Sequence, residues 1–308
     1  MNHTNLAHQL ASGDLPLDAL PDLDGGDYCS AHAIGDEHLL LVGRTTEASN
    51  ALSRAAAMLP GLESRVTLAI PSSEASGLLP DGRHFLVTRR LTGVPLSRDL
   101  FKTLSPQQQT AAAEALATFL FEMHATPVAL ADAAGIPVAW YPFAATEDGM
   151  ADGPSAPHYA NDLARIAQHE LIPQAAIDRL SALVDEQLAR ERKRQAEPVL
   201  LHGEVSADHV FVDPESLSVT GIIDFQGLVL GDPVRDLMYM ADDFSLPFAE
   251  QVARAYSHPR LADPLPTLSF YRVWHIIVRM LWGAEHGYAE RAAMLARQLE
   301  TAIETGVR

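Results

Sequence analysis

The segment 199–237 constrains the fold most, because it holds two short β-like runs separated by a turn. The runs HVFVD and SVTGIIDF flank the tetrapeptide DPES at 213–216, whose composition is typical of a tight turn. An antiparallel hairpin at this turn would bring the residues before its first strand close to the end of its second strand. The sequence therefore predicts that Glu204, His209 and Asp224 converge on one spot.

These three side chains offer two carboxylates and one imidazole beside a loop, a donor set that suits a hard divalent cation bridging phosphates. Asp224 ends an apolar run, where an unpaired buried carboxylate is costly, so we expect it to have a functional role. Two structural alternatives stay open. Glu204 could be a solvated loop residue, and His209 could be a hydrogen-bonded structural histidine.

Charge and cysteine content exclude several classes of protein. With 22 Lys+Arg against 40 Asp+Glu, the net charge of −18 repels polyphosphate backbones, so no nucleic acid partner is expected. The same charge would attract a cationic ligand, although solubility is the simpler explanation. A single cysteine, Cys29, excludes an intrachain disulfide and a cysteine-rich zinc cage. No apolar stretch has membrane-spanning length and no secretory signal begins the chain, so we expect a cytoplasmic protein without a membrane partner.

The chain of 308 residues exceeds one small core, and its texture changes near residue 91. Up to that point it is strand-rich, with apolar runs at 38–44 and 84–91 and a hairpin turn before the first of them. Between these runs, the segment 48–62 has the apolar spacing of a helix that should stop at Pro60. Residues 1–91 therefore predict a small sheet packed on one main helix.

Residues 92–308 have the pattern of a larger, mostly helical unit. A capping box at 105–108 opens a helix that ends before Pro127, and His124 is expected to cap the end of that helix. Further helical patterns cover 175–194 and 268–303, while 147–158 is rich in Gly, Pro and Asp and predicts a loop. The predicted fold class is α+β, with two lobes divided at residues 91 and 92.

Four ordered blocks carry a family resemblance. They are H-G-D-x-x-x-x-N/H at 202–209, I-D-F/W at 223–225, G-D-P-x-x-D-L at 231–237, and A-L-A-x-F-L-x-x-[LM]-H-x-x-P at 115–127. In these blocks the chain resembles the aminoglycoside and macrolide phosphotransferases, small-molecule kinases with the bilobal protein-kinase-like fold. The resemblance implies transfer of the γ-phosphate of ATP or GTP, with Mg²⁺, to a hydroxyl group of a small molecule.

The resemblance also implies roles for the residues of the second lobe. Glu204 stands at the position of the catalytic Asp and would accept or orient the proton of the attacking hydroxyl. His209 and Asp224 would hold the magnesium ions. His202 and Asp236 would support the catalytic loop rather than touch the substrate.

In the first lobe, the resemblance implies nucleotide contacts. Arg44 would substitute for the phosphate-binding lysine, and Ser30, in the loop GGDYCS at 25–30, would cover the phosphates. The segment 88–91 would be the hinge, with Arg89 and Leu91 beside the nucleotide base.

Two departures from the family pattern bear on activity. Glu204 is longer by one methylene than the family's Asp, which affects positioning more than chemistry. The only lysines, Lys102 and Lys193, lie outside the first lobe, and Ala55 occupies the place of the helical Glu that would pair with a lysine there. The phosphate-clamping ion pair is therefore missing.

Three functions remain open. The first is a phosphotransferase acting on an aminoglycoside or macrolide antibiotic, whose pocket would be formed by 147–162 and the helices after it. The second is a kinase-fold binding protein with weakened catalysis, and the third is a metabolic kinase for a sugar, choline or an amino-acid alcohol. The sequence contains no G-x-S-x-G, Walker A or G-x-G-x-x-G motif, so hydrolase, P-loop and dinucleotide chemistries are not supported.

Overall fold

The computed structural model describes residues 3–23, 26, 28–141, 143, 145–146, 149–150, 155–194 and 197–305. Half of the predicted loop at 147–158 lies outside these residues, as do two positions of the predicted phosphate-covering loop, Gly25 and Asp27.

The first lobe is built on a four-stranded antiparallel sheet with the order β1-β2-β4-β3. Its strands are β1 (Cys29–Ile34), β2 (His38–Gly43), β3 (Ser73–Leu78) and β4 (His84–Arg89). The predicted turn before β2 is confirmed, and Gly35 in it has a φ of 59°, a conformation that glycine adopts without steric cost. Both apolar runs at 38–44 and 84–91 form strands.

One long helix, α2 (Thr46–Glu63), packs against this sheet. Thr45 caps its start by accepting a hydrogen bond from the backbone N–H of Ala48 (3.1 Å). The prediction that the helix stops at Pro60 is wrong. Pro60 removes only one hydrogen bond near the end of the helix, and the buried side chains of Leu59 and Leu62 hold the last turn against the core.

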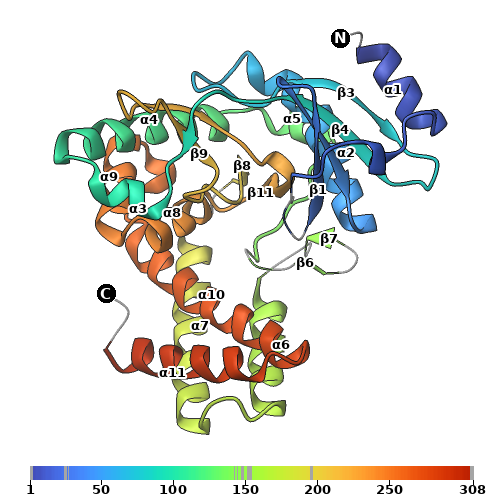
Figure 1. The fold of residues 1–308 in the computed structure, drawn as a ribbon. Helices are drawn as coiled ribbons and strands as arrows, with labels where there is room; N and C mark the ends of the chain where they lie inside the picture. Colours follow the sequence, from blue (N-terminus) through green and yellow to red (C-terminus); the bar gives the residue numbers. More distant parts are fainter. Residues whose placement is uncertain are drawn as a thin grey trace.

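The other face of the sheet is covered by α1 (His3–Ser12), followed by the short 3-10 helix η1 (Leu17–Ala19). Leu6 and Leu10 of α1 form a separate small core with side chains of β2 and β4. Figure 1 shows α1 beside β3 at the outer edge of the first lobe. The sequence analysis did not anticipate this helix.

The two lobes are joined by more than the chain segment after β4. The strand β5 (Val94–Pro95) pairs with β9 (Val210–Val212), which in turn pairs with β10 (Val219–Ile222). Ala69, which lies before β3, forms two backbone hydrogen bonds with β10. Its N–H donates to the carbonyl of Thr220, and its carbonyl accepts from the N–H of Ile222. The lobe boundary at residue 91 stays a prediction.

The second lobe is mostly helical (Figure 1). Its helices are α3 (Arg98–Thr103), α4 (Pro106–His124), α5 (Val128–Ala133), α6 (Ala156–Gln168), α7 (Gln174–Arg194), α8 (Met238–Asp243), α9 (Leu246–Tyr256), α10 (Leu265–Glu285) and α11 (Ala289–Thr305), with short pieces β6 (Ala145–Thr146), β7 (Gly149–Met150) and η4 (Pro259–Leu261). The capping box of α4 is confirmed. The pattern predicted over 268–303 forms two helices, since Gly287, with a φ of 82°, lies between α10 and α11.

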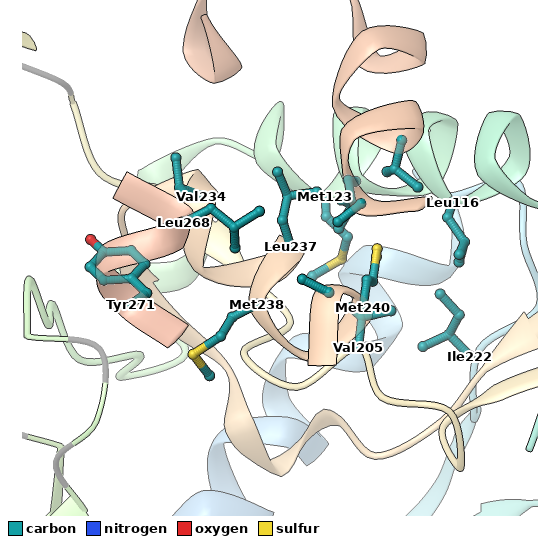
Figure 2. Packing of buried hydrophobic residues seen from close by; sticks show 14 of the residues in the cluster. Leu116, Met123, Val205, Ile222, Val234, Leu237, Met238, Met240, Leu268 and Tyr271 are labelled. Carbon is teal, nitrogen blue, oxygen red and sulfur yellow. The ribbon is translucent and has the colours of Figure 1, made fainter. Parts of the chain in front are cut away.

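The main core joins α4, α8 and α10 to the segment that carries the predicted site. Figure 2 shows Val205, Met240 and Leu116 packed in this core, with Ile222 of β10 beside them. Val205 directly follows Glu204 and is fully buried, so the core anchors the loop that presents Glu204. The predicted α+β fold, with a small β-rich lobe and a larger helical lobe, is confirmed. Among the described residues, no helix is both long and apolar enough to cross a lipid bilayer.

Candidate active site

The predicted hairpin is formed by β9 and β10. Its turn is stabilised by Asp213, whose Oδ1 accepts hydrogen bonds from the backbone N–H groups of Glu215 (3.1 Å) and Ser216 (2.7 Å). A third bond comes from the Ser216 hydroxyl (2.9 Å). The hairpin brings Glu204, His209 and Asp224 to the lining of one cleft, as the sequence pattern predicts.

His209 and Asp224 are in direct contact. The Nε2 atom of His209 lies 3.2 Å from Oδ2 of Asp224, while Nδ1 lies 2.9 Å from the backbone carbonyl of Glu204. A carbonyl oxygen only accepts, so Nδ1 carries a proton and donates it there. This bond orients the ring so that Nε2 faces the carboxylate, as a metal-ligating histidine requires.

The backbone at Asp224 has a left-handed conformation (φ 72°, ψ 65°) and starts the 3-10 helix η2 (Phe225–Gly227). This turn lies against residues 202–209, the predicted catalytic loop, hereafter the catalytic loop, at a position where both segments need glycine. A Cβ on Gly203, whose φ is 90°, would lie 2.3 Å from the carbonyl oxygen of Gly227. The close approach fixes the distance between the loop that carries Glu204 and the turn that carries Asp224.

Asp236, on the 3-10 helix η3 (Pro233–Leu237), is fully buried and holds the start of the catalytic loop. It accepts hydrogen bonds from the backbone N–H groups of His202 (3.1 Å) and Gly203 (2.8 Å). A third partner is Nε2 of His124 (3.1 Å). Burial by itself would raise the pKa of Asp236, but the bond and the charge of His124 keep that pKa below its ordinary value.

His124 does not cap the end of α4, contrary to the prediction. Its other ring nitrogen, Nδ1, contacts the hydroxyl of Tyr256 (3.1 Å), and the ring is buried. The side chain is used to orient Asp236 from a distance of 112 residues in the sequence, a contact that the spacing of a single helix cannot reveal.

His202 links the catalytic loop to the end of β10. Its Nε2 lies 3.0 Å from the backbone carbonyl of Ile223 and donates to it, while Nδ1 accepts from the N–H of Glu204 (3.3 Å). Burial lowers the pKa of His202 to about 4, so the ring is neutral at physiological pH. A neutral ring can donate at one nitrogen and accept at the other, which this pair of bonds requires.

A second carboxylate, that of the half-buried Asp243 at the end of α8, supports the other half of this loop. It accepts a hydrogen bond from the N–H of Ala207 (2.8 Å) and forms an ion pair with Arg98. The sequence analysis missed both residues, because neither belongs to a block of the family pattern. The strand β8 (Val199–Leu201), paired with β11 (Val229–Gly231), completes the frame of the loop.

Glu204 is half-buried, and its carboxylate forms no hydrogen bond with the described residues. Burial raises its pKa, and the nearby charge of Asp224 adds to that rise, while His209 and Arg235 oppose it. Arg235 itself has two buried nitrogens, Nε and one terminal nitrogen, without a hydrogen-bond partner. Glu204 is therefore available to accept a proton from a bound hydroxyl.

The cleft between the lobes has a volume of about 930 Å³, a size typical of a small-molecule or nucleotide pocket. One end, beside the segment 88–91, is lined largely by apolar side chains, among them Leu39, Leu86 and Phe211. The other end contains Asp224 and Gln226. The apolar end can accept a flat base, and the polar end can accept phosphates.

The predicted nucleotide residues divide into two pairs. Arg89 and Leu91 line the cleft, whereas Ser30 and Arg44 are not among the described residues that line it. For Ser30, strand alternation explains this, because Cys29 and Ala31 of β1 face the cleft and the residue between them faces the opposite side. Ser30 contacts His32 (3.2 Å), and Nε of Arg44 donates to the carbonyl of Gly26 (3.2 Å). Their assignment to the nucleotide stays a prediction.

Arg54, which was not predicted from the sequence, also lines the cleft, together with Glu47 and with Tyr28 of the predicted phosphate-covering loop. The hydroxyl of Tyr28 is hydrogen-bonded to Glu47. Arg54 lies next to Ala55 on α2, so a search for a charged neighbour of the missing helical Glu would have found it.

The donor set at Asp224 fits magnesium better than zinc. No group of three or more His, Cys, Asp or Glu side chains that could hold a metal occurs in the described part of the chain. Mg²⁺ is commonly bound by one or two carboxylates together with water and substrate phosphates, whereas structural zinc needs four protein ligands. Asp224 supplies one such carboxylate, and Nε2 of His209 lies beside it.

Comparisons with solved structures show the same fold. The GDP complex of wild-type aminoglycoside 2'-phosphotransferase-IIIa is 21% identical, with a TM-score of 0.81 and 98% of each chain covered. The streptomycin–ATP ternary complex of APH(2")-IIa is 18% identical, with a TM-score of 0.68, covering 97% of this chain and 95% of that one. Macrolide 2'-phosphotransferase MphH from Brachybacterium faecium is 21% identical, with a TM-score of 0.65, covering 96% and 98%.

A comparison with curated protein sequences gave no significant match. The profile of the Phosphotransferase enzyme family, however, matches residues 39–271. The match begins at β2 and includes the catalytic loop, Asp224 and the Asp236 brace, and it covers well over half of the chain. The chain therefore belongs to the Phosphotransferase enzyme family.

Proposed function

We propose that this phosphotransferase moves the γ-phosphate of ATP or GTP to a hydroxyl group of a small molecule in a Mg²⁺-dependent reaction. The observation that carries the proposal is the contact between His209 and Asp224 at the polar end of a cleft that also contains the unbonded carboxylate of Glu204. A metal site and a proton acceptor at one end of a nucleotide-sized cleft are the parts that phosphoryl transfer needs.

Each of these residues has a role in the proposed reaction. Asp224 and His209 would hold Mg²⁺, which neutralises charge on the phosphates when bound. Glu204 orients the acceptor hydroxyl toward the γ-phosphorus and accepts its proton as the new P–O bond forms and the bond to the leaving nucleoside diphosphate breaks. His202 and Asp236 position the loop and do not touch the substrate.

Glu204 in place of Asp changes the reach of the carboxylate more than its chemistry. Phosphoryl transfer has a loose transition state, so strong base catalysis contributes little to its rate. The anchoring of Val205 in the core and the close contact of Gly203 with Gly227 position the backbone on either side of Glu204. We infer that this carboxylate supports transfer.

The acceptor that we favour is a hydroxylated antibiotic, either an aminoglycoside or a macrolide. The support comes from the structural neighbours, which include a streptomycin–ATP complex and a macrolide 2'-phosphotransferase. We place the acceptor pocket at 147–162 and the helices after it, on the far side of Glu204 from the nucleotide. Much of this segment lies outside the described residues.

The direct test is a mass-spectrometric screen with Mg²⁺ and a mixture of ATP and GTP. Pools of aminoglycosides, macrolides and common hydroxylated metabolites would serve as acceptors, and Asp224→Asn would be the negative control. A product heavier by one phosphoryl group that requires Asp224 supports the proposal and names the acceptor. The same product from a sugar, choline or an amino-acid alcohol alone would favour a metabolic kinase.

A second candidate, a kinase-fold protein that binds nucleotide without efficient transfer, is favoured by Glu204 and by the absence of a lysine from the first lobe. Comparing wild type with Glu204→Asp separates the two candidates. Transfer by the wild-type chain supports the enzyme. Transfer by the Asp variant alone would mean that the native chain is a binding protein.

A further inference from the structure

The cleft contains few positive charges for a ligand as anionic as a nucleoside triphosphate. Its cationic lining residues, among the described part of the chain, are Arg54, Arg89 and Arg90. From β2, the side chains that face the cleft are Leu39 and Leu41, so this strand offers no cation. Among the residues that line the cleft, these three arginines are the candidates for a direct contact with the phosphates.

Arg89 and Arg90 are poorly placed for that task. Arg89 is the last residue of β4 and Arg90 follows it, beside the apolar end of the cleft, and both are exposed. Arg89 also has a partner, since one of its terminal nitrogens lies 3.5 Å from a carboxylate oxygen of Glu74. Exposed cations at this end can attract a nucleotide to the cleft, but water screens their charge strongly.

Arg54 lies on the helix that borders the Asp224 end. Its helix, α2, contacts η2, the turn that begins directly after Asp224. Ala55 and Leu59 of the same helix line the cleft with it. The side chain of Arg54 is half-buried, so its charge is less screened by water than the charges of the exposed arginines.

The guanidinium of Arg54 forms no hydrogen bond or ion pair with the described residues. Glu47, the nearest acidic residue in the cleft lining on the same helix, is instead hydrogen-bonded to the hydroxyl of Tyr28. A half-buried arginine in a cleft is usually paired, because an arginine has five donors to satisfy. The unpaired state is what a site that binds an external anion requires.

We propose that Arg54 binds the phosphate oxygens of the nucleotide, so that α2 supplies the positive charge that β2 lacks. This inference rests on the proposed function, because it assumes that the cleft binds a nucleotide. Arginine is suited to the role because its planar guanidinium can donate two parallel hydrogen bonds to a phosphate group. The alternative is that Arg54 is a solvated arginine of α2 that binds no ligand.

The test compares triphosphate and nucleoside binding, because only the former has phosphates. Isothermal titration calorimetry would measure the Kd of ATP, GTP, adenosine and guanosine, with Mg²⁺, for wild type, Arg54→Ala and Arg54→Lys. Arg65→Ala, an exposed arginine just after α2 and outside the cleft lining, is the matched control. We expect Arg54→Ala to weaken triphosphate binding by about 10- to 100-fold, with nucleoside binding unchanged. Arg54→Lys should recover part of the loss.

Several outcomes would overturn the proposal. Equal losses for triphosphate and nucleoside would mean that Arg54 acts on the shape of the cleft. Unchanged triphosphate binding in Arg54→Ala, or a larger selective loss in Arg44→Ala than in Arg54→Ala, would assign the phosphates elsewhere. If wild type bound neither nucleosides nor triphosphates, the proposed function would fail as well. A failure of Arg54 alone leaves wild-type binding intact, so the two failures are distinguishable.

Discussion

The two walls of the cleft are built in different ways. On the side of the helical lobe, Glu204 and Asp224 are held by a frame of two carboxylates, Asp236 and Asp243, together with backbone N–H groups and closely packed glycines. On the side of the small lobe, Leu41 of β2 and Ala55 of α2 line the cleft, and Arg54 is the half-buried cation. Groups that touch the reacting atoms need fixed positions, whereas charge near the phosphates can come from more than one element.

The largest effect on the helical-lobe wall of the cleft is expected when Asp236, its central buried carboxylate, is removed. Asp236→Ala leaves two backbone N–H groups and His124 without their acceptor, so we expect a loss of about 3–5 kcal/mol in the free energy of unfolding and a loss of transfer activity. Urea denaturation and a turnover assay would measure both. Asp236→Asn, which keeps one acceptor oxygen, should be milder. Equal stability of all three proteins would contradict the role of Asp236 as a brace.

The next largest effect should come from Asp224, and it should be confined to activity. Its side chain is 38% exposed and contacts only His209 among the interactions described above, so Asp224→Asn should leave the free energy of unfolding nearly unchanged. Loss of a charged metal ligand should lower kcat by about 10²- to 10³-fold and raise the Mg²⁺ concentration needed for half-maximal rate. A drop in stability as large as that of Asp236→Ala would mean that Asp224 belongs to the structural frame.

For the small-lobe wall of the cleft, we expect a smaller effect than for Asp236 or Asp224. The loss expected for Arg54→Ala is in triphosphate affinity, and a charge lost there can be replaced in part by lysine. The two walls would thus differ in kind as well as in size. If Arg54→Lys lost as much as Arg54→Ala, the small-lobe wall would be as geometrically demanding as the catalytic loop.

The pH dependence of transfer should report on Glu204. Burial raises the pKa of this carboxyl group, and only the ionised form accepts a proton, so activity should fall as the pH drops through the raised pKa. Glu204→Gln should lower kcat by about 10²-fold and remove this acidic limb. Arg235→Met should move the limb to higher pH, because the charge of Arg235 stabilises the ionised form. An acidic limb that persists in Glu204→Gln would assign it to another group.

The sequence was most informative where local rules decide the structure. The turn at 213–216 and the strands on either side follow from turn composition and β-like patterning, and they predict the convergence of Glu204, His209 and Asp224. The capping box of α4 is equally local. These features needed no knowledge of the tertiary fold.

The features that could not be predicted from the sequence depend on contacts between residues far apart in the chain. Arg98 and Asp243 are 145 residues apart, and no periodicity places one beside the other. Pro60 is tolerated in α2 because packing of the last turn outweighs one lost hydrogen bond. The outward facing of Ser30 was open to analysis from strand alternation, because its neighbours Cys29 and Ala31 in β1 both face the cleft.

The smallest effect at neutral pH concerns His202, since the ring is neutral there in both the folded and the unfolded chain. Burial lowers its pKa from 6.5 to about 4 in the folded protein. Between these values the unfolded chain binds a proton that the folded chain does not, so the free energy of unfolding should rise with pH from about 4 to 6.5 and show no further contribution from His202 above that range. The full contribution is about 3 kcal/mol. Denaturation of wild type and His202→Gln at several pH values would measure it, and an equally steep pH dependence in the variant would place the titrating group elsewhere. A shallower dependence in the variant would show that acid destabilises the folded protein through His202, in the wall that holds the catalytic loop in place.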